Sequence, residues 1–168
     1  MADSAEEPRK RRTLGGWKFI VAIVLILAYF AGATYGVMSD TSIRGLTVKM
    51  FNVSRYCTTT GSLETLNYNV RGSIWSTSSI QTNLSHLSFM LSVDGSVIGT
   101  NSQGDSSFAP GQSVQFNLTF THPTLDPTLL PSASRLVLTL SATVAAGLYS
   151  AAETASDSTL QTFSSTGC

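Results

Sequence analysis

The sequence predicts an all-β fold, an antiparallel β-sandwich of six or seven strands, preceded by a single N-terminal transmembrane helix. Three observations carry this prediction. Residues 19–38 contain no charged side chain, and a helix of this length spans a hydrocarbon core of roughly 30 Å. Beyond that segment, apolar residues alternate with polar ones at the period of a half-buried strand. Turn-forming stretches separate these runs and no long helical period lies between them, which favours a sandwich or barrel.

The composition limits the number of domains and the class of partner. The chain has 168 residues, which leaves room for one domain behind the membrane segment. Its formal net charge is +0, and only 12% of its residues are charged, against roughly 25% in ordinary soluble domains. A neutral chain with so few cations is a poor match to nucleic acid, so we expect no nucleic-acid partner.

The basic residues predict the orientation of the helix in the cell membrane. Half of the ten precede the apolar run: Arg9, Lys10, Arg11, Arg12 and Lys18. By the positive-inside rule, they predict a cytoplasmic N-terminus and an extracytoplasmic C-terminal domain. The expected organisation is therefore a basic cytoplasmic tail (1–16), a transmembrane helix (17–38), a connector (39–45) and an extracytoplasmic β-sandwich (46–168).

The predicted span also has features of a helix that lies in the bilayer beside another helix. Trp17 and Tyr35 lie near its two ends, where aromatic belts occur. Ala28, Gly32 and Gly36 are small residues at four-residue spacing, which lets a second helix approach closely. The expected partners are therefore the lipid bilayer and an integral-membrane or envelope protein.

Three alternatives to this signal-anchor are open. A cleaved secretory signal would end near the small residues 31–33. A pilin-type leader would be processed after residues 15–16, although Lys18 would then lie in the packed helix. A twin-arginine signal would use residues 11–12, whose following residues match that motif poorly. The signal-anchor is favoured because apolar character continues beyond the cleavage site to Val37.

The first half of the domain is expected to form three strands and a hairpin. Apolar alternation runs over residues 46–50, 66–74 and 87–93, with Trp75 on the face opposite the apolar one and a break at 76–79. Asp94-Gly95 suits a type I′ turn because both residues tolerate positive φ. With this turn at the tip, we expect Val93 to pair with Ser96 and Leu91 with Ile98.

The second half is expected to continue the strand pattern. A polar loop through Asn101, Gly104 and Asp105 precedes an alternating strand at 114–120. Three prolines predict a loop over 122–131, with one helical turn at 126–130. A strand follows at 136–140 and a last strand is expected near Leu160 and Phe163. The segment 142–155 is compatible either with a short helix or with a strand and loop.

The two cysteines and three sequons are candidate modification sites. Cys57 and Cys168 are predicted to form a structural disulfide outside the cell, contributing about 4–5 kcal/mol in the chain-entropy model. Two free thiols, or attachment of a lipid or cofactor, are the alternatives. Asn52, Asn83 and Asn117 each begin an N-glycosylation sequon. Asn117 alternates with apolar neighbours, so we expect its side chain to point outward and Asn117 to be the favoured sugar acceptor of the three.

No pattern in the sequence indicates catalysis or a cofactor. His86 is expected to be exposed and His122 to lie in a loop, without metal-ligand spacing around either. There is no G-x-S-x-G elbow and no phosphate-binding glycine loop. Asp94 is explained by the turn. We therefore expect a protein that is not an enzyme by itself and has no catalytic, cofactor-binding or metal-binding residues.

Part of the domain resembles a known family. The segments LSFMLSVDGSVIGT and FAPGQSVQFNLTF, within residues 66–120, resemble the late embryogenesis abundant group 2 domain, also called the water-stress and hypersensitivity domain. This resemblance implies a compact antiparallel β-sandwich with a short helix, often tethered by one membrane span. It implies binding, protection or scaffolding and no catalytic residues. The Asn-Pro-Asn turn typical of many members is absent, since residues 79–83 read SIQTN.

These observations favour a non-enzymatic, membrane-anchored domain that acts through protein contacts, as an accessory or structural subunit of a membrane or cell-envelope complex. A pilin-like filament or surface-layer component is an alternative that requires processing near Gly16. The small subunit of a membrane oxidoreductase and a stress-protective domain are two further alternatives.

Overall fold

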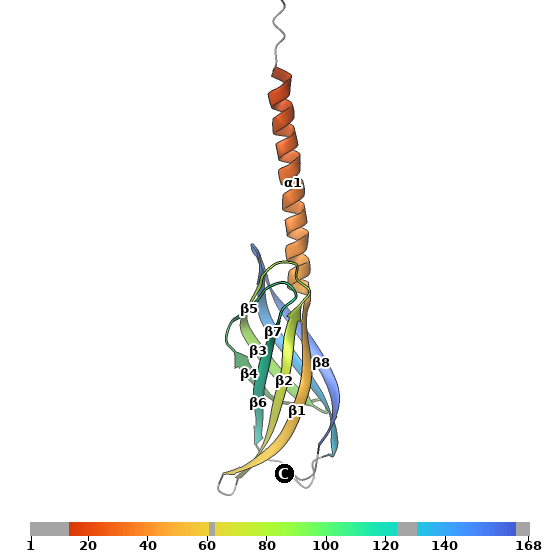
Figure 1. The fold of residues 1–168 in the computed structure, drawn as a ribbon. Helices are drawn as coiled ribbons and strands as arrows, with labels where there is room; N and C mark the ends of the chain where they lie inside the picture. The colour runs from red at the N-terminus through yellow and green to blue at the C-terminus, as the bar shows by residue number, and fades with distance from the viewer. Residues whose placement is uncertain (1–13, 61–62, 124–130, 164–168) are drawn as a thin grey trace, which may run out of the picture. The chain divides into compact units, whose positions relative to one another are not determined.

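The computed structural model describes residues 14–60, 63–123 and 131–163. The chain divides into two compact units, Met1–Val37 and Met38–Cys168. The first contains most of the helix, and the second, which we call the β domain, contains all the described strands (Figure 1). The predicted class is confirmed at this level, because an apolar N-terminal helix precedes antiparallel sheets.

Helix α1 spans Leu14–Arg44. Its part from Gly16 to Arg44 has 29 residues and a hydropathy of 2.2 in its most apolar window, none of which is buried. Among the described residues it is the one helix whose length and composition allow it to cross a membrane. It is therefore a candidate membrane anchor, and a signal sequence fits the same features.

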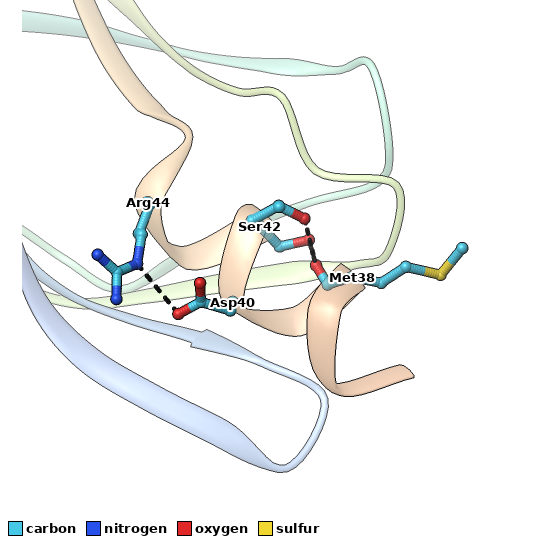
Figure 2. Close-up of polar contacts among 5 residues, drawn as sticks. Met38, Asp40, Ser42 and Arg44 are labelled. Carbon is cyan, nitrogen blue, oxygen red and sulfur yellow. Dashed lines mark hydrogen bonds and ion pairs between the residues drawn. The ribbon is translucent and has the colours of Figure 1, made fainter. Parts of the chain in front are cut away.

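α1 continues through the segment that we expected to be a connector, 39–45, and ends at Arg44. The hydroxyls of Thr41 and Ser42 donate hydrogen bonds to the Met38 carbonyl at 3.0 and 2.6 Å. The Arg44 guanidinium pairs with Asp40 at 3.1 Å, one turn away (Figure 2). The polar sequence suggested a loop, but these side chains bond to their own helix and leave it intact.

The last turn of α1 is bonded to the start of the β domain. The Ser78 hydroxyl donates to the Ser42 hydroxyl at 2.7 Å, and Ser76 donates to the Ser42 carbonyl at 3.3 Å. The Thr77 amide donates to the Gly45 carbonyl at 3.2 Å. A Cβ at Gly45 would lie 2.0 Å from the Thr77 hydroxyl, so a larger residue there would force the Thr77 side chain to move.

Sheet A contains three antiparallel strands in the order β1-β2-β6. They are β1 (Leu46–Thr60), β2 (Leu63–Ser76) and β6 (Ser113–Pro123). The break that we predicted at 76–79 is confirmed, because β2 ends at Ser76.

Sheet B contains five antiparallel strands, with β4-β3-β7-β8 in order and β5 pairing with β3. They are β3 (Thr82–Val93), β4 (Ser96–Gln103), β5 (Ser106–Phe108), β7 (Ala133–Ala146) and β8 (Tyr149–Thr162). The described residues thus form eight strands rather than six or seven. The expected polar loop at 101–105 is largely strand, and part of the predicted loop 122–131 lies outside the described residues, including the helical turn at 126–130.

The two sheets share one core, which is built from the apolar side of each alternating strand. Phe89 of β3 and Phe116 of β6 meet across it with ring centroids 5.0 Å apart. The predicted inward residues are confirmed, since those of 46–50, 66–74, 87–93 and 136–140 are buried. Trp75 is exposed, on the face opposite to its buried neighbours, as the alternation predicts.

The predicted β3–β4 hairpin is confirmed at its turn but not at every pair. Asp94 and Gly95 both have positive φ (50° and 86°), as a type I′ turn requires. Val93 pairs with Ser96 as predicted, but Leu91 pairs with Gly99 rather than Ile98. A register shift between Leu91 and Ser92 inserts one extra residue in β4, which alternation alone does not reveal.

The segment 142–155 is a β-hairpin rather than a helix. β7 continues to Ala146 and pairs along its whole length with β8. Gly147, with a φ of 62°, makes the turn. The small side chains of this segment fit a strand because alternate ones, such as Ala142, Val144 and Ala146, are buried against the core.

Candidate functional site

The predicted disulfide involves one described and one undescribed residue. Cys57 lies in β1 and packs against the core, whereas Cys168 lies outside the described residues, so their pairing stays a prediction. The last described residue, Phe163, packs on Tyr68 (centroids 6.0 Å apart) and beneath the Arg55 guanidinium at 4.5 Å. Arg55 is two residues from Cys57 on the same strand.

The three sequon asparagines lie at exposed positions on three different strands. Asn52 is in β1, Asn83 in β3 and Asn117 in β6. The outward orientation predicted for Asn117 is confirmed, and its side-chain oxygen accepts a hydrogen bond from Asn69 at 2.9 Å. Their use as sugar acceptors stays a prediction.

The small residues proposed for helix packing lie on α1. Ala28 and Gly32 are exposed and Gly36 is partly exposed. A Cβ at Gly32 would meet no atom within 4 Å. The described chain therefore leaves this stripe open to a second helix, and packing there stays a prediction.

The outer face of sheet A carries three exposed aromatic side chains. Phe51, Tyr56 and Trp75 are 57%, 39% and 40% exposed. The Phe51 and Trp75 rings lie 6.4 Å apart, and Lys49 Nζ lies 5.9 Å from the Trp75 ring centroid. With Arg71, which lies on the same face, we call these five residues the aromatic face.

A β-bulge positions part of this face. The register of β1 shifts between Met50 and Asn52, so Phe51 has no partner on β2 and two consecutive side chains, Phe51 and Asn52, are exposed. The Met50 amide donates to the Asp157 carboxylate of β8 at 2.7 Å. This bond ties the edge of sheet A to the edge of sheet B.

A hollow of about 590 Å³ lies beside the bulge, lined by residues of β1, β2 and β6. Gly72 of β2 is one of its lining residues. A Cβ there would lie 2.2 Å from the Lys49 carbonyl and 2.4 Å from the Phe116 ring. Glycine is thus required for the strands and the Phe116 ring to pack this closely.

The hollow combines apolar and polar groups and has a cation at its edge. Arg71 lines it and forms no hydrogen bond or ion pair with any described residue. Asn52, Gln115 and Asn117 add amide groups that both donate and accept hydrogen bonds. No acidic residue occupies an outward position of sheet A within the described strands. Such a surface favours carboxylate and amide groups on a partner.

Hydrogen bonds between side chains also link neighbouring strands on the outer side of sheet A, next to the aromatic face. The Asn69 amide donates to Asn117 at 2.9 Å and to Thr119 at 3.3 Å. The Thr121 hydroxyl donates to the Asn67 side-chain oxygen at 2.9 Å. These side chains are already ordered, so a partner that binds here loses less conformational entropy.

The two histidines are not brought together. His86 is exposed as predicted, with a φ of 53° at an irregularity of β3. The prediction that His122 lies in a loop is wrong, because it is in β6 and pairs with Leu66. The strand continues to Pro123, where a proline is tolerated at the strand end. In the described part of the chain, no three His, Cys, Asp or Glu residues are placed to hold a metal ion.

A second concave feature lies between the two sheets. A cavity of about 270 Å³ is lined by Leu66, Tyr68 and His122 of sheet A and by residues of β3, β4 and β7. Burial raises the pKa of Tyr68, and the nearby Arg55 opposes that shift.

Sequence reasoning did not identify the aromatic face, although two local signals point to it. The buried residues Val48, Met50 and Val53 are spaced by two and then by three, and this interruption indicates a bulge. Gly72 in the interior of a strand indicates a close backbone approach. The cavity has no comparable signal because its lining comes from five separate strands and a loop.

No protein-family model matches the sequence, and no match was found among curated proteins. Three solved structures are similar to parts of it. A protein from Archaeoglobus fulgidus has 8% identity and a TM-score of 0.38, over 68% of this chain and 97% of that one. The sporulation control protein Spo0M of Bacillus subtilis has 17% identity and a TM-score of 0.39, over 72% and 50%. A Bordetella pertussis protein described as ApaA has 14% identity and a TM-score of 0.38, over 72% and 97%. TM-scores this low indicate neither a family nor a function for this chain.

Proposed function

We propose that the protein is a non-enzymatic, membrane-anchored extracytoplasmic β-sandwich that acts through protein contacts, as an accessory or structural subunit of a membrane or cell-envelope complex. The aromatic face of sheet A is the proposed contact surface. The observation that carries the proposal is the exposure of Phe51, Tyr56 and Trp75 on the same sheet face as Arg71, whose side chain has no partner among the described residues.

The residue types of this face support a protein contact. Aromatic residues and arginine are enriched at protein interfaces and supply most hot spots. About 40% of Trp75 is exposed, which for a side chain of roughly 200 Å² is about 80 Å². Burying that area contributes about 2 kcal/mol at 25 cal/mol per Å². Lys49 and Arg71 favour a partner surface with acidic groups.

The anchor supports a partner within the same membrane. In this proposal α1 is a retained signal-anchor, with a cytoplasmic N-terminus and the β domain outside. The small residues Ala28, Gly32 and Gly36 then provide a second contact, for a helix of an integral-membrane partner. The disulfide between Cys57 and Cys168 would form in that oxidising compartment.

A contact at this face restricts which sequons carry sugar. Asn52 and Asn117 line the hollow of the aromatic face, so a glycan on either would cover it. Asn83 lies on β3, in the other sheet. In this proposal Asn83 is the sequon that is modified, and Asn52 and Asn117 remain bare, which differs from the expectation from sequence that Asn117 is the favoured acceptor.

Photo-crosslinking in the native membrane tests the proposal. A benzoylphenylalanine replaces Trp75 in the full-length chain, and in a matched control it replaces Met90, an exposed apolar residue of sheet B that is 36% exposed. The proposal predicts a discrete adduct with one membrane or envelope protein from position 75 and none from position 90. Equal adducts from both positions, or none from either, would contradict a specific contact at the aromatic face.

A further inference from the structure

The cavity between the sheets is separate from the aromatic face. It lies at the end of β3 that carries the Asp94-Gly95 turn, whereas Ser78, which precedes the other end of β3, bonds to Ser42 in the last turn of α1. Its volume is about 270 Å³, close to the lower end of the range for small-molecule sites. Leu66, Tyr68 and Val93 form buried apolar walls.

Two buried polar atoms of the cavity lining have no hydrogen-bond partner among the residues that the structure describes. They are Ser134 Oγ, in a residue only 2% exposed, and His122 Nδ1. His122 comes from sheet A and Ser134 from sheet B, so the two atoms belong to opposite walls. Buried polar groups without partners are rare because their desolvation is not compensated. A group that enters the cavity and bonds to them would remove this cost.

From this arrangement we infer that the cavity is a binding site for a small uncharged molecule with an apolar body and a hydroxyl group. The hydroxyl would pair with Ser134 Oγ and His122 Nδ1, and the body would contact the apolar walls. A serine hydroxyl both donates and accepts, and a neutral imidazole nitrogen does one or the other. A ligand hydroxyl, which also does both, matches either state of the histidine.

Size and charge narrow the ligand class. The cavity holds about as much as nine waters at ~30 Å³ each, which suits one ring or a short branched chain. Water alone is a poor occupant of most of this volume, since an ordered water needs two to four polar partners and the walls are largely apolar. The Asp94 carboxylate at the lining and the Arg55 guanidinium beside Tyr68 have opposite charges, which favours an uncharged ligand over an anion or a cation.

Phenol and benzene test the inference, because they differ by one hydroxyl and both are smaller than the cavity. The full-length chain is placed in lipid nanodiscs with ¹³C-labelled histidine and ¹³C-methyl isoleucine. His122 and Ile98 report the cavity, and exposed His86 is the internal control. We expect saturable shifts of the His122 and Ile98 signals, no shift of His86, and about tenfold tighter binding of phenol than of benzene, the worth of about one hydrogen bond.

Two matched serine variants test whether the unpaired Ser134 hydroxyl causes the preference for phenol over benzene. Ser134→Ala is expected to abolish most of the phenol preference while leaving the melting temperature equal or higher, because it removes an unpaired buried group. Ser73→Ala is the control, since Ser73 is equally buried and equally without a partner but lies on the outer side of β2. It should leave the preference intact.

The opposite results would overturn the inference. Absence of a saturable His122 or Ile98 shift with phenol would show that the cavity is not a ligand site. Equal binding of phenol and benzene, or a preference that survives in Ser134→Ala, would show that the orphaned atoms do not select the ligand. None of these outcomes bears on the contact at the aromatic face, which crosslinking tests separately.

Discussion

Replacing Asp157 should destabilise the β domain by releasing the bulge that shapes the aromatic face. Its Oδ2 accepts the Met50 amide at 2.7 Å, and its Oδ1 accepts the Ser158 amide at 2.9 Å. Met50 is only 8% exposed, so in Asp157→Ala its amide loses a charged acceptor in a largely buried position. Such a loss costs about 2 kcal/mol. For a domain of this size, that lowers the melting temperature by roughly 6–10 °C.

Asp157→Asn should lower the free energy of unfolding by about half as much as Asp157→Ala. An amide has one oxygen, which can stay on the buried Met50 amide while water takes over at the more exposed Ser158. Charge assistance is lost in either case, and charged hydrogen bonds are about twice as strong as neutral ones.

Thermal unfolding of the nanodisc-embedded full-length chain, followed by circular dichroism of the strands, measures these effects. Glu153→Ala is the matched control, because it removes a carboxylate from the same strand and no side-chain hydrogen bond of Glu153 is found among the described residues. If Asp157→Ala melts within about 1 °C of Glu153→Ala, the bond between Met50 and Asp157 does not stabilise the bulge and the reasoning is wrong.

Three further predictions concern the hollow, the cavity and the sequons. Gly72→Ala should lower the free energy of unfolding, measured with denaturant, by about 2–3 kcal/mol because its Cβ would collide with backbone. Gly99→Ala should lower it by less than about 1 kcal/mol because its Cβ would meet its nearest atom at 3.9 Å. Equal losses in the two variants would contradict the close approach inferred at Gly72. Burial raises the pKa of Tyr68 above its ordinary 10.0, so its contribution to stability is complete below pH 10 and is lost as the pH rises through the raised value. Raising the pH through this range should therefore reduce the stability of the wild-type chain more than that of Tyr68→Phe. An equal loss of stability in the two chains would contradict this prediction. Glycopeptide mass spectrometry of the native protein should find sugar on Asn83 only, and sugar at Asn117 would argue against a contact at the aromatic face.

The alternation of apolar residues was sufficient to predict most of the strands. Side chains point alternately to two faces, so buried sets such as those of 87–93 and 136–140 can be identified from spacing alone. The Asp94-Gly95 turn was predictable for a similar local reason, since few residue pairs tolerate two positive φ angles.

The features that build the candidate sites depend on contacts between distant segments. The Met50 amide is satisfied by Asp157, which is 107 residues away in the sequence. The continuation of α1 to Arg44 depends partly on the contact between Ser42 and Ser78. His122 belongs to a strand because Leu66 pairs with it, and the polar sequence before Pro123 gave no sign of that pairing. Local pattern cannot predict these contacts because they depend on tertiary packing.

The most direct test of the proposed function is gentle-detergent purification from the native membrane, with mass spectrometry of the intact chain and of the proteins that copurify. We expect an uncleaved N-terminus and one integral-membrane or envelope protein in fixed ratio, lost from Trp75→Ala but retained by Met90→Ala. A chain cut near Gly16 or Ala33, or a chain that purifies alone, would contradict the anchored-subunit proposal and favour a filament or a secreted protein.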